Sequence, residues 1–138
     1  MWNCCKPSCS WPGKASVSNP VASCYKENSG FNIARADQPS GCDNGGYTYT
    51  CTNQQPWAVN DTFSYGFAGV SLASANQDLQ CSSCYQLDFT ADSVLSGKSM
   101  IVQIVNSGTR PGSAQFDLQI PGILAFVFYN DTFRRRRE

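Results

Sequence analysis

The stretch Trp2-Asn3-Cys4-Cys5-Lys6-Pro7-Ser8-Cys9-Ser10-Trp11 constrains the fold more than any other part of the sequence. Three cysteines and two tryptophans fall within these ten residues. Cysteine this dense, interrupted by proline, does not suit a core strand, whereas it is typical of loops that disulfides hold in place. The N-terminal region is therefore expected to be a loop region tied to the remainder of the fold.

Cysteine usage along the whole chain supports an oxidising compartment. The 138 residues include eight cysteines, a density that predicts a disulfide framework within a single domain. Asn-x-Thr triplets at Asn60 and Asn130 are compatible with a secretory route. We therefore expect a secreted, extracellular protein. Residues 2–20 lack the pattern of a signal peptide, which we interpret as a mature form or an added initiator Met.

Charge and the missing histidine exclude several classes of function. Residues 1–133 carry six basic and nine acidic side chains, a net of −3, which does not suit nucleic-acid binding. The basic run Arg134–Arg137 is interpreted as a solvated terminus. The apolar run Ile120–Tyr129 is too short to span a bilayer. Without histidine, Ser-His-Asp chemistry cannot be built, so hydrolysis would rest on carboxylates, with no cofactor and no metal.

Alternation of apolar residues predicts a mainly β fold. Strands are expected at Cys84–Thr90, Met100–Val105 and Phe116–Ile120. Residues 1–56 are expected to be loops, and a short helix is expected from Pro56 to Ala68 because proline suits a first helical turn. The expected arrangement of these strands is a barrel. The Cys81-Ser82-Ser83-Cys84 spacing would also suit a redox or metal motif, but disulfide use is favoured because no second pair matches it.

Two segments together resemble the signatures of glycoside hydrolase family 45, the small endo-1,4-β-glucanases. One is the opening decapeptide and the other is Ser113-Ala114-Gln115-Phe116-Asp117-Leu118-Gln119-Ile120-Pro121-Gly122. The resemblance implies a six-stranded double-psi β-barrel with long disulfide-linked loops. It also implies inverting hydrolysis of β-1,4-glucan (cellulose), in which two carboxyl groups flank the bond. The expected partner is that polysaccharide, bound by a monomer.

The resemblance assigns the catalytic positions and reveals a change at one of them. Asp117 corresponds to the general acid, and Asn3 occupies the position of the general base. An amide cannot take up a proton at useful pH, and loss of a positioned base costs about 10²–10⁴ in rate. We therefore expect very low activity with glucan binding retained. An accessory aspartate of the family falls on Arg110, and Met1 stands where the family has a tyrosine.

Three further residues near the first signature are candidate glucan ligands. Trp2 and Trp11 could stack on the C–H face of a sugar ring, and Lys6 could hydrogen-bond a hydroxyl. The alternative for each tryptophan is packing between disulfides. A lone lysine is a weak signal.

The resemblance also implies a disulfide pattern and a boundary. It pairs Cys5 with Cys42, Cys9 with Cys81, and Cys24 with Cys51. Cys4 and Cys84 correspond to cysteines whose family partners lie beyond residue 138. Residues 1–122 would form a partial catalytic domain, whereas residues 123–138 resemble nothing in the family and are interpreted as a non-family tail. The barrel would then be incomplete at its C-terminal side.

Two other classes remain open. Expansin-like, non-hydrolytic modules that bind cell-wall polysaccharide share the fold and also lack the base, but the Cys-Cys-Lys-Pro-Ser-Cys-Ser-Trp run belongs to the hydrolases. A secreted defence protein of the barwin type shares the barrel but does not account for both signatures.

Overall fold

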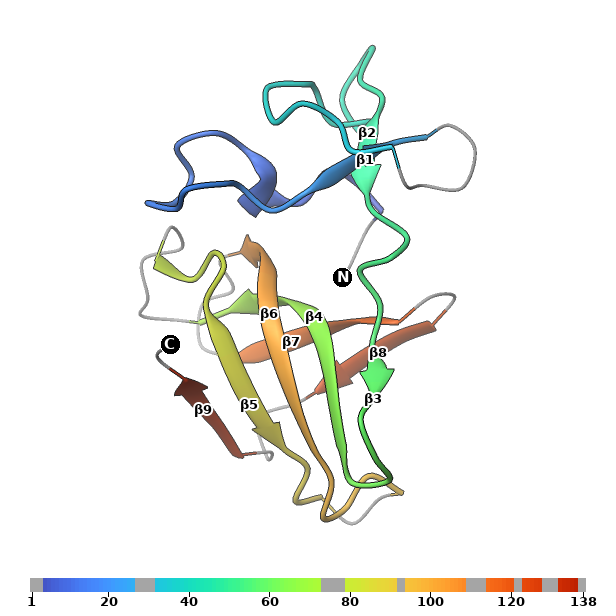
Figure 1. Cartoon of the computed structure of the whole chain (residues 1–138), viewed down its shortest axis with the longest axis vertical. Helices are drawn as coiled ribbons and strands as arrows, with labels where there is room; N and C mark the ends of the chain where they lie inside the picture. Colours follow the sequence, from blue (N-terminus) through green and yellow to red (C-terminus); the bar gives the residue numbers. More distant parts are fainter. Residues whose placement is uncertain are drawn as a thin grey trace.

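The computed structural model describes residues 4–26, 32–72, 79–91, 94–108, 114–120, 123–127 and 132–136, the last two ranges for their backbone alone. A loop-rich N-terminal module stands at one end of a curved β-sheet (Figure 1). In chain order the elements are η1 (Ser8–Ser10), β1 (Ser23–Tyr25), β2 (Thr48–Thr50), β3 (Trp57–Ala58), β4 (Phe63–Ser71), β5 (Cys84–Asp88), β6 (Ser99–Gly108), β7 (Gln115–Ile120), β8 (Ile123–Val127) and β9 (Thr132–Arg136).

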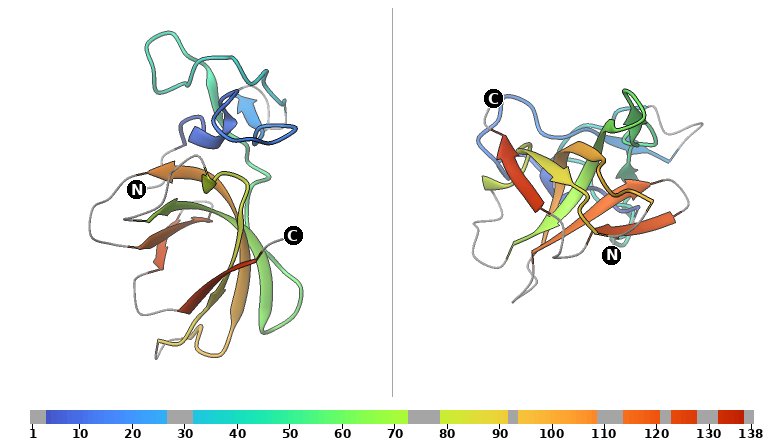
Figure 2. Two further views of the ribbon diagram at one scale, coloured as in Figure 1. Left: turned by 90° about the vertical axis from the view of Figure 1, so that its left-hand side faces the viewer. Right: turned by 90° about the horizontal axis from the view of Figure 1, so that it is seen from below.

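The large sheet follows the order β8-β7-β4-β6-β5-β9, and β3 pairs with β4 beside β7. Strands β4 and β6 are parallel, whereas the other pairs of this sheet are antiparallel. The end strands β8 and β9 are not paired with each other in the described part of the chain, so the curved sheet stays open (Figure 2). The expected mainly β class and the incomplete barrel are confirmed, whereas the double-psi crossing stays a prediction.

All three strands expected from alternation are confirmed, as β5, β6 and β7. The expected helix from Pro56 to Ala68 is wrong, because this segment forms β3, a turn and most of β4. In the turn, the Thr62 N–H donates to Asn60 Oδ1 at 2.9 Å, and the Val59 N–H donates to the Phe63 carbonyl at 2.9 Å. Among the described residues, no helix is long and apolar enough to cross a membrane.

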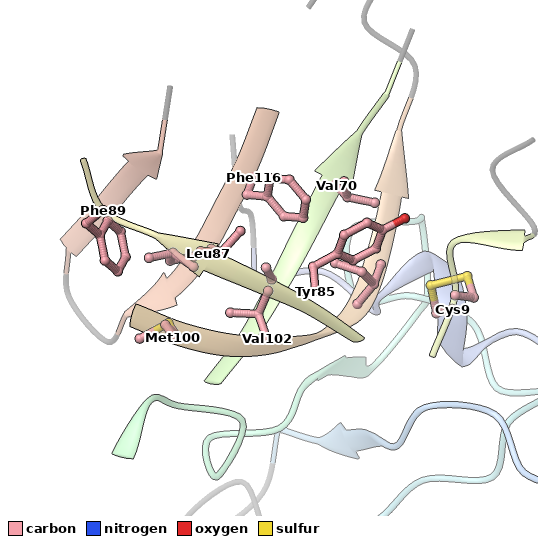
Figure 3. Packing of buried hydrophobic residues seen from close by; sticks show 12 residues of the cluster. Cys9, Val70, Tyr85, Leu87, Phe89, Met100, Val102 and Phe116 are labelled. Carbon is pink, nitrogen blue, oxygen red and sulfur yellow. A yellow bond between two sulfur atoms is a disulfide. The ribbon is translucent and has the colours of Figure 1, made fainter. Parts of the chain in front are cut away.

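One face of the sheet carries the hydrophobic core. Phe116, Leu87, Val102 and Ile104 are at most 1% exposed and come from three strands. The Tyr85 ring packs edge to face on Phe116 with 5.2 Å between the ring centroids (Figure 3). Such burial is worth about 1.5–3 kcal/mol for each large side chain, so this face holds the strands together.

Three disulfides hold the N-terminal module, two within it and one to the segment before β5, and all three pairings expected from the family resemblance are confirmed. They are Cys5–Cys42, Cys9–Cys81 and Cys24–Cys51. Cys4 and Cys84 lie outside these three bonds. Within the module, β1 and β2 form a short antiparallel pair, and Cys5 bridges to Tyr49 of β2. Disulfides therefore replace the apolar core that this small module lacks.

Polar contacts of Ser8 join the module to the end of β6. The Ser8 N–H donates to Asn106 Oδ1 at 2.9 Å, and the Ser107 N–H donates to Ser8 Oγ at 2.8 Å. The neighbouring residue Cys9 is bonded to Cys81, which precedes β5. The module is thus attached to the sheet by hydrogen bonds and by a covalent bond.

Lys6 is buried inside the module, although it is charged. Its side chain is 6% exposed, and Nζ donates to the carbonyls of Ala36 at 2.6 Å and Gln38 at 2.7 Å. Nζ also lies 3.4 Å from the centroid of the Trp11 ring. Burial lowers the pKa of Lys6, and the negative charge of Asp37 opposes that shift. The ammonium therefore links three segments of the module.

Replacing Lys6 by Met should destabilise the fold by about 2–3 kcal/mol. The change keeps the length of the side chain but leaves two backbone carbonyls without their charged donor. Lys26→Met, at an exposed lysine, is the matched control and should leave stability within about 0.5 kcal/mol. Denaturant unfolding of the two variants and the parent measures the difference, and equal midpoints for both variants would contradict this role.

Removing the Cys9–Cys81 bond through Cys9→Ala with Cys81→Ala should cost about 4 kcal/mol. The bond closes a loop with a sequence separation of 72 residues, so its loss releases much unfolded-chain entropy. Cys4→Ala is the control, because Cys4 is exposed and lies outside the three disulfides. A loss below about 1 kcal/mol in denaturant unfolding would show that the hydrogen bonds of Ser8 suffice to hold the module.

Candidate active site

Asp117 lies in the middle of β7, on the face of the sheet that points away from the core. Its neighbours Phe116 and Leu118 are buried at 1% and 4% exposure, whereas Asp117 is partly exposed. This alternation follows from strand geometry, in which successive side chains point to opposite faces. Asp117 therefore points away from the core.

Gln115 is a direct partner of Asp117 that the sequence reasoning missed. It lies two residues earlier on the same face of β7, is 7% exposed, and donates from Nε2 to Asp117 Oδ1 at 2.5 Å. The signal available in the sequence was the i, i+2 spacing, which places two strand residues on one face. This hydrogen bond fixes the orientation of the Asp117 carboxyl group.

A row of paired residues connects Asp117 to the N-terminal module. Asp117 pairs with Gly69 on β4, and Gly69 pairs with Asn106 on β6. Strands lie about 4.8 Å apart, so the Cα atoms of Asp117 and Asn106 are about 10 Å apart, with no side chain between them at Gly69. Asn106 in turn accepts the N–H of Ser8. Ser8 belongs to the first signature, so the row brings the two signature segments to one face of the molecule.

The row coincides with an irregularity in the sheet. The register of β4 against β6 shifts between Ala68 and Gly69, so that Val105 has no partner on β4. Such bulges change the direction in which the following side chains point and are frequent near active sites. Here the residue directly after the bulge is Asn106, the acceptor for Ser8.

Of the remaining predicted site residues, Lys6 and Trp11 lie together and two lie outside the described residues. The Lys6 ammonium faces the Trp11 ring and two carbonyls, contacts that hold the module together. One face of Trp11 is thereby occupied, although its side chain is partly exposed. Asn3 and Trp2 fall outside the described residues, as does Arg110.

The cavities in the described part of the fold include two that Asp117 does not line. One, of about 490 Å³, is largely apolar and is lined by Phe63, Phe89, Met100 and Leu118 among others. The other, of about 330 Å³, lies between the module and the sheet and includes Phe67 in its lining. Within the described ranges, no group of three His, Cys, Asp or Glu residues could hold a metal ion.

Comparison with known proteins gives one consistent result. The sequence model of glycosyl hydrolase family 45 matches residues 1–132. A putative endoglucanase type K from Fusarium oxysporum is 46% identical over 121 residues, covering 88% of this chain and 31% of that protein. An endoglucanase from Cryptopygus antarcticus is also 46% identical, covering 88% of this chain and 52% of that protein.

A solved structure supports the same family assignment as the sequence comparisons. The crystal structure of the cellulase from the Antarctic springtail Cryptopygus antarcticus matches with a TM-score of 0.79 at 43% identity, covering 88% of this chain and 56% of that one. The chain thus spans between about a third and a half of the length of these curated relatives. Because the family model covers nearly the whole sequence and the fold agrees, the chain belongs to glycosyl hydrolase family 45.

Proposed function

We propose that the chain carries the glucan-binding and acid-bearing part of an endo-1,4-β-glucanase that inverts the anomeric centre. Family membership and relatives that are named endoglucanases support this function. The substrate is a β-1,4-glucan, and the protein acts as an extracellular monomer without a cofactor. Three disulfides are consistent with an oxidising, extracellular setting.

Asp117 is the proposed general acid, which protonates the leaving glycosidic oxygen. The observation that carries this role is the row Asp117–Gly69–Asn106, which sets the acid about 10 Å from the attachment point of the first signature. Inverting glycosidases hold their two carboxyl groups about 6.5–9.5 Å apart, with a water molecule on the opposite side of the sugar. A glycine in the middle of the row leaves room for a sugar above the sheet.

Asn3, which directly precedes Cys4, occupies the proposed position of the general base. The backbone carbonyl of Cys4 accepts the N–H of Thr50 on β2 at 3.1 Å, which holds the start of the signature on the module. An amide can orient a water molecule but cannot accept its proton. Very low hydrolytic activity follows, whereas glucan binding persists because an amide nearly retains the shape of a carboxylate.

The remaining parts of the proposal concern sugar contacts and the extent of the domain. Trp2 and the partly exposed face of Trp11 stack on sugar rings. Lys6 contributes to binding by holding Trp11 in place. The catalytic domain comprises residues 1–122 and residues 123–138 are a tail, although the family match extends to residue 132. Sequencing the transcript across codon 122 tests this boundary.

A second candidate function is an expansin-like module that binds cell-wall polysaccharide without cleaving it. The asparagine at position 3 favours it, because binding does not require a base. The two candidates differ in the response to restoring the carboxylate.

Asn3→Asp should raise reducing-sugar release from carboxymethylcellulose by about 10²–10⁴-fold over the parent chain, because it restores a proton acceptor. Asn44→Asp, at an exposed turn residue, is the control for adding a carboxylate and should leave the rate unchanged. Unchanged inactivity of Asn3→Asp, with cellulose binding intact, would contradict the hydrolase and favour the binding module.

Asp117→Asn in the Asn3→Asp background should return activity to the level of the parent or below, since the leaving oxygen then lacks its proton donor. Asp61→Asn is the matched control, at an exposed aspartate in the turn after β3. Substrates with a good leaving group, such as a dinitrophenyl cellobioside, should be affected much less than cellulose. Equal losses on both substrates would argue against an acid role.

A further inference from the structure

The cavity between the N-terminal module and the sheet is lined by five uncharged polar residues, one aromatic ring and the small apolar residues Pro20, Val21 and Ala22. Its volume is about 330 Å³, at the lower end of the range for small-molecule sites. The residues that characterise its lining are Asn19, Asn53, Gln54, Phe67, Ser82 and Gln103. They come from the segment before β1, the segment after β2, the strands β4 and β6, and, for Ser82, the segment before β5. We refer to this cavity as the amide cleft.

The floor of the amide cleft is fixed by the sheet. Phe67 on β4 pairs with Gln103 on β6, so the aromatic ring and the amide group stand side by side on the face away from the core. Gly69, two residues after Phe67, pairs with Asp117 on the same face. Two strand residues span about 7 Å, so the cleft lies roughly one sugar unit along the sheet from the proposed acid.

The wall of the cleft contains a buried acceptor without a donor. Gln54 is 6% exposed, and its Nε2 donates to the Ala22 carbonyl at 3.0 Å. The same group's Oε1 is buried and has no hydrogen-bond partner among the described residues. An acceptor left in this state costs about 1–3 kcal/mol, so the structure carries a local cost at a residue that lines the cleft.

Ser82 closes the cleft in an unusual backbone conformation. Its φ is 63°, the left-handed region that serine adopts only at a cost of about 1–2 kcal/mol. The conformation is held because the Ser82 N–H donates to the Ile104 carbonyl at 2.9 Å and because Cys81, its neighbour, is bonded to Cys9. Strain that the surrounding structure maintains in this way is frequent at ligand sites.

An exposed aromatic row continues the floor of the cleft outward. The ring centroid of Trp57 lies 6.0 Å from that of Phe67 and 5.4 Å from that of Tyr65, on which it stacks. Trp57 is 52% exposed and Tyr65 is 37% exposed. Aromatic surface of this kind packs well against the C–H faces of sugar rings. A ligand longer than one sugar unit could therefore extend from the cleft along this row.

These features select one class of ligand. The cleft has no charged residue in its lining, which does not suit a phosphate, a nucleotide or the charged ends of a peptide. Side-chain amides both donate and accept, as sugar hydroxyls do, and an aromatic floor matches a pyranose face. We infer that the amide cleft and its aromatic row are a second glucan-binding site, which holds a β-1,4-linked glucose oligomer beside the Asp117 row. The identity of the sugar rests on the proposed function, whereas its neutral polyhydroxyl chemistry rests on the cleft.

The test is the binding of cellotetraose to the whole chain, measured by titration calorimetry. Asn53→Ala with Gln103→Ala removes amides that do not hold the fold, and affinity should fall about ten- to thirtyfold. Trp57→Ala should weaken binding about three- to tenfold through lost stacking. Asn44→Ala, an exposed asparagine outside the cleft, is the matched control and should bind like the parent. Equal thermal unfolding midpoints establish that all variants fold.

The binding experiment tests the second site independently of the proposed hydrolytic activity. If both cleft variants bind cellotetraose like the parent, the second site is overturned, even if Asn3→Asp is an active glucanase. Weakened binding by both cleft variants supports the site, even if Asn3→Asp stays inactive. Chemical-shift changes at the side-chain amides of Gln54 and Gln103 on addition of cellobiose would place the sugar in the cleft. Their absence at saturation would contradict it.

Discussion

The arrangement of the molecule depends on the attachment of Ser8 and Cys9 to the sheet. Ser8 and Asn106 are separated by 98 residues, and the hydrogen bond between them joins the first signature to β6, which is separated by β4 from the strand β7 that carries Asp117. The Cys9–Cys81 bond makes the same connection covalent. Without this attachment the module could move relative to the sheet, because its own disulfides and its buried Lys6 only hold the module to itself. The amide cleft would also lose one of its walls.

Regular alternation was sufficient to predict β5, β6 and β7, because each strand buries one face and presents the other. At residues 56–68 the proline at the start of the segment predicts a helix, whereas the pattern that follows it forms a strand. Phe63, Tyr65 and Phe67 alternate with smaller residues in β4, which is a strand pattern. This strand pattern is hard to recognise in the sequence, because the turn at Asn60 and the two-residue strand β3 before it have no strong sequence signal.

The surroundings of Asp117 were predictable only in part, because local patterns can be recognised in the sequence whereas long-range strand pairing cannot. The orientation of Asp117 follows from local alternation, and the disulfide pairing followed from the family resemblance. Gly69 and Asn106 could not be foreseen, because their positions opposite Asp117 depend on long-range strand register and on the bulge at Val105. Lys6 was expected to reach a sugar. It is buried because two carbonyls and the Trp11 ring replace its water shell.

Charge is nearly absent from the face that carries these features. On β4, β6 and β7, the residues facing away from the core are aromatic, amide, hydroxyl, aliphatic or glycine, and Asp117 is the exception. A neutral face binds a neutral polymer through shape, stacking and hydrogen bonds, so its affinity is insensitive to salt. In the proposed function, Asn3 lacks the capacity to accept a proton but keeps groups that hydrogen-bond hydroxyls, so recognition and catalysis would depend on separate residues.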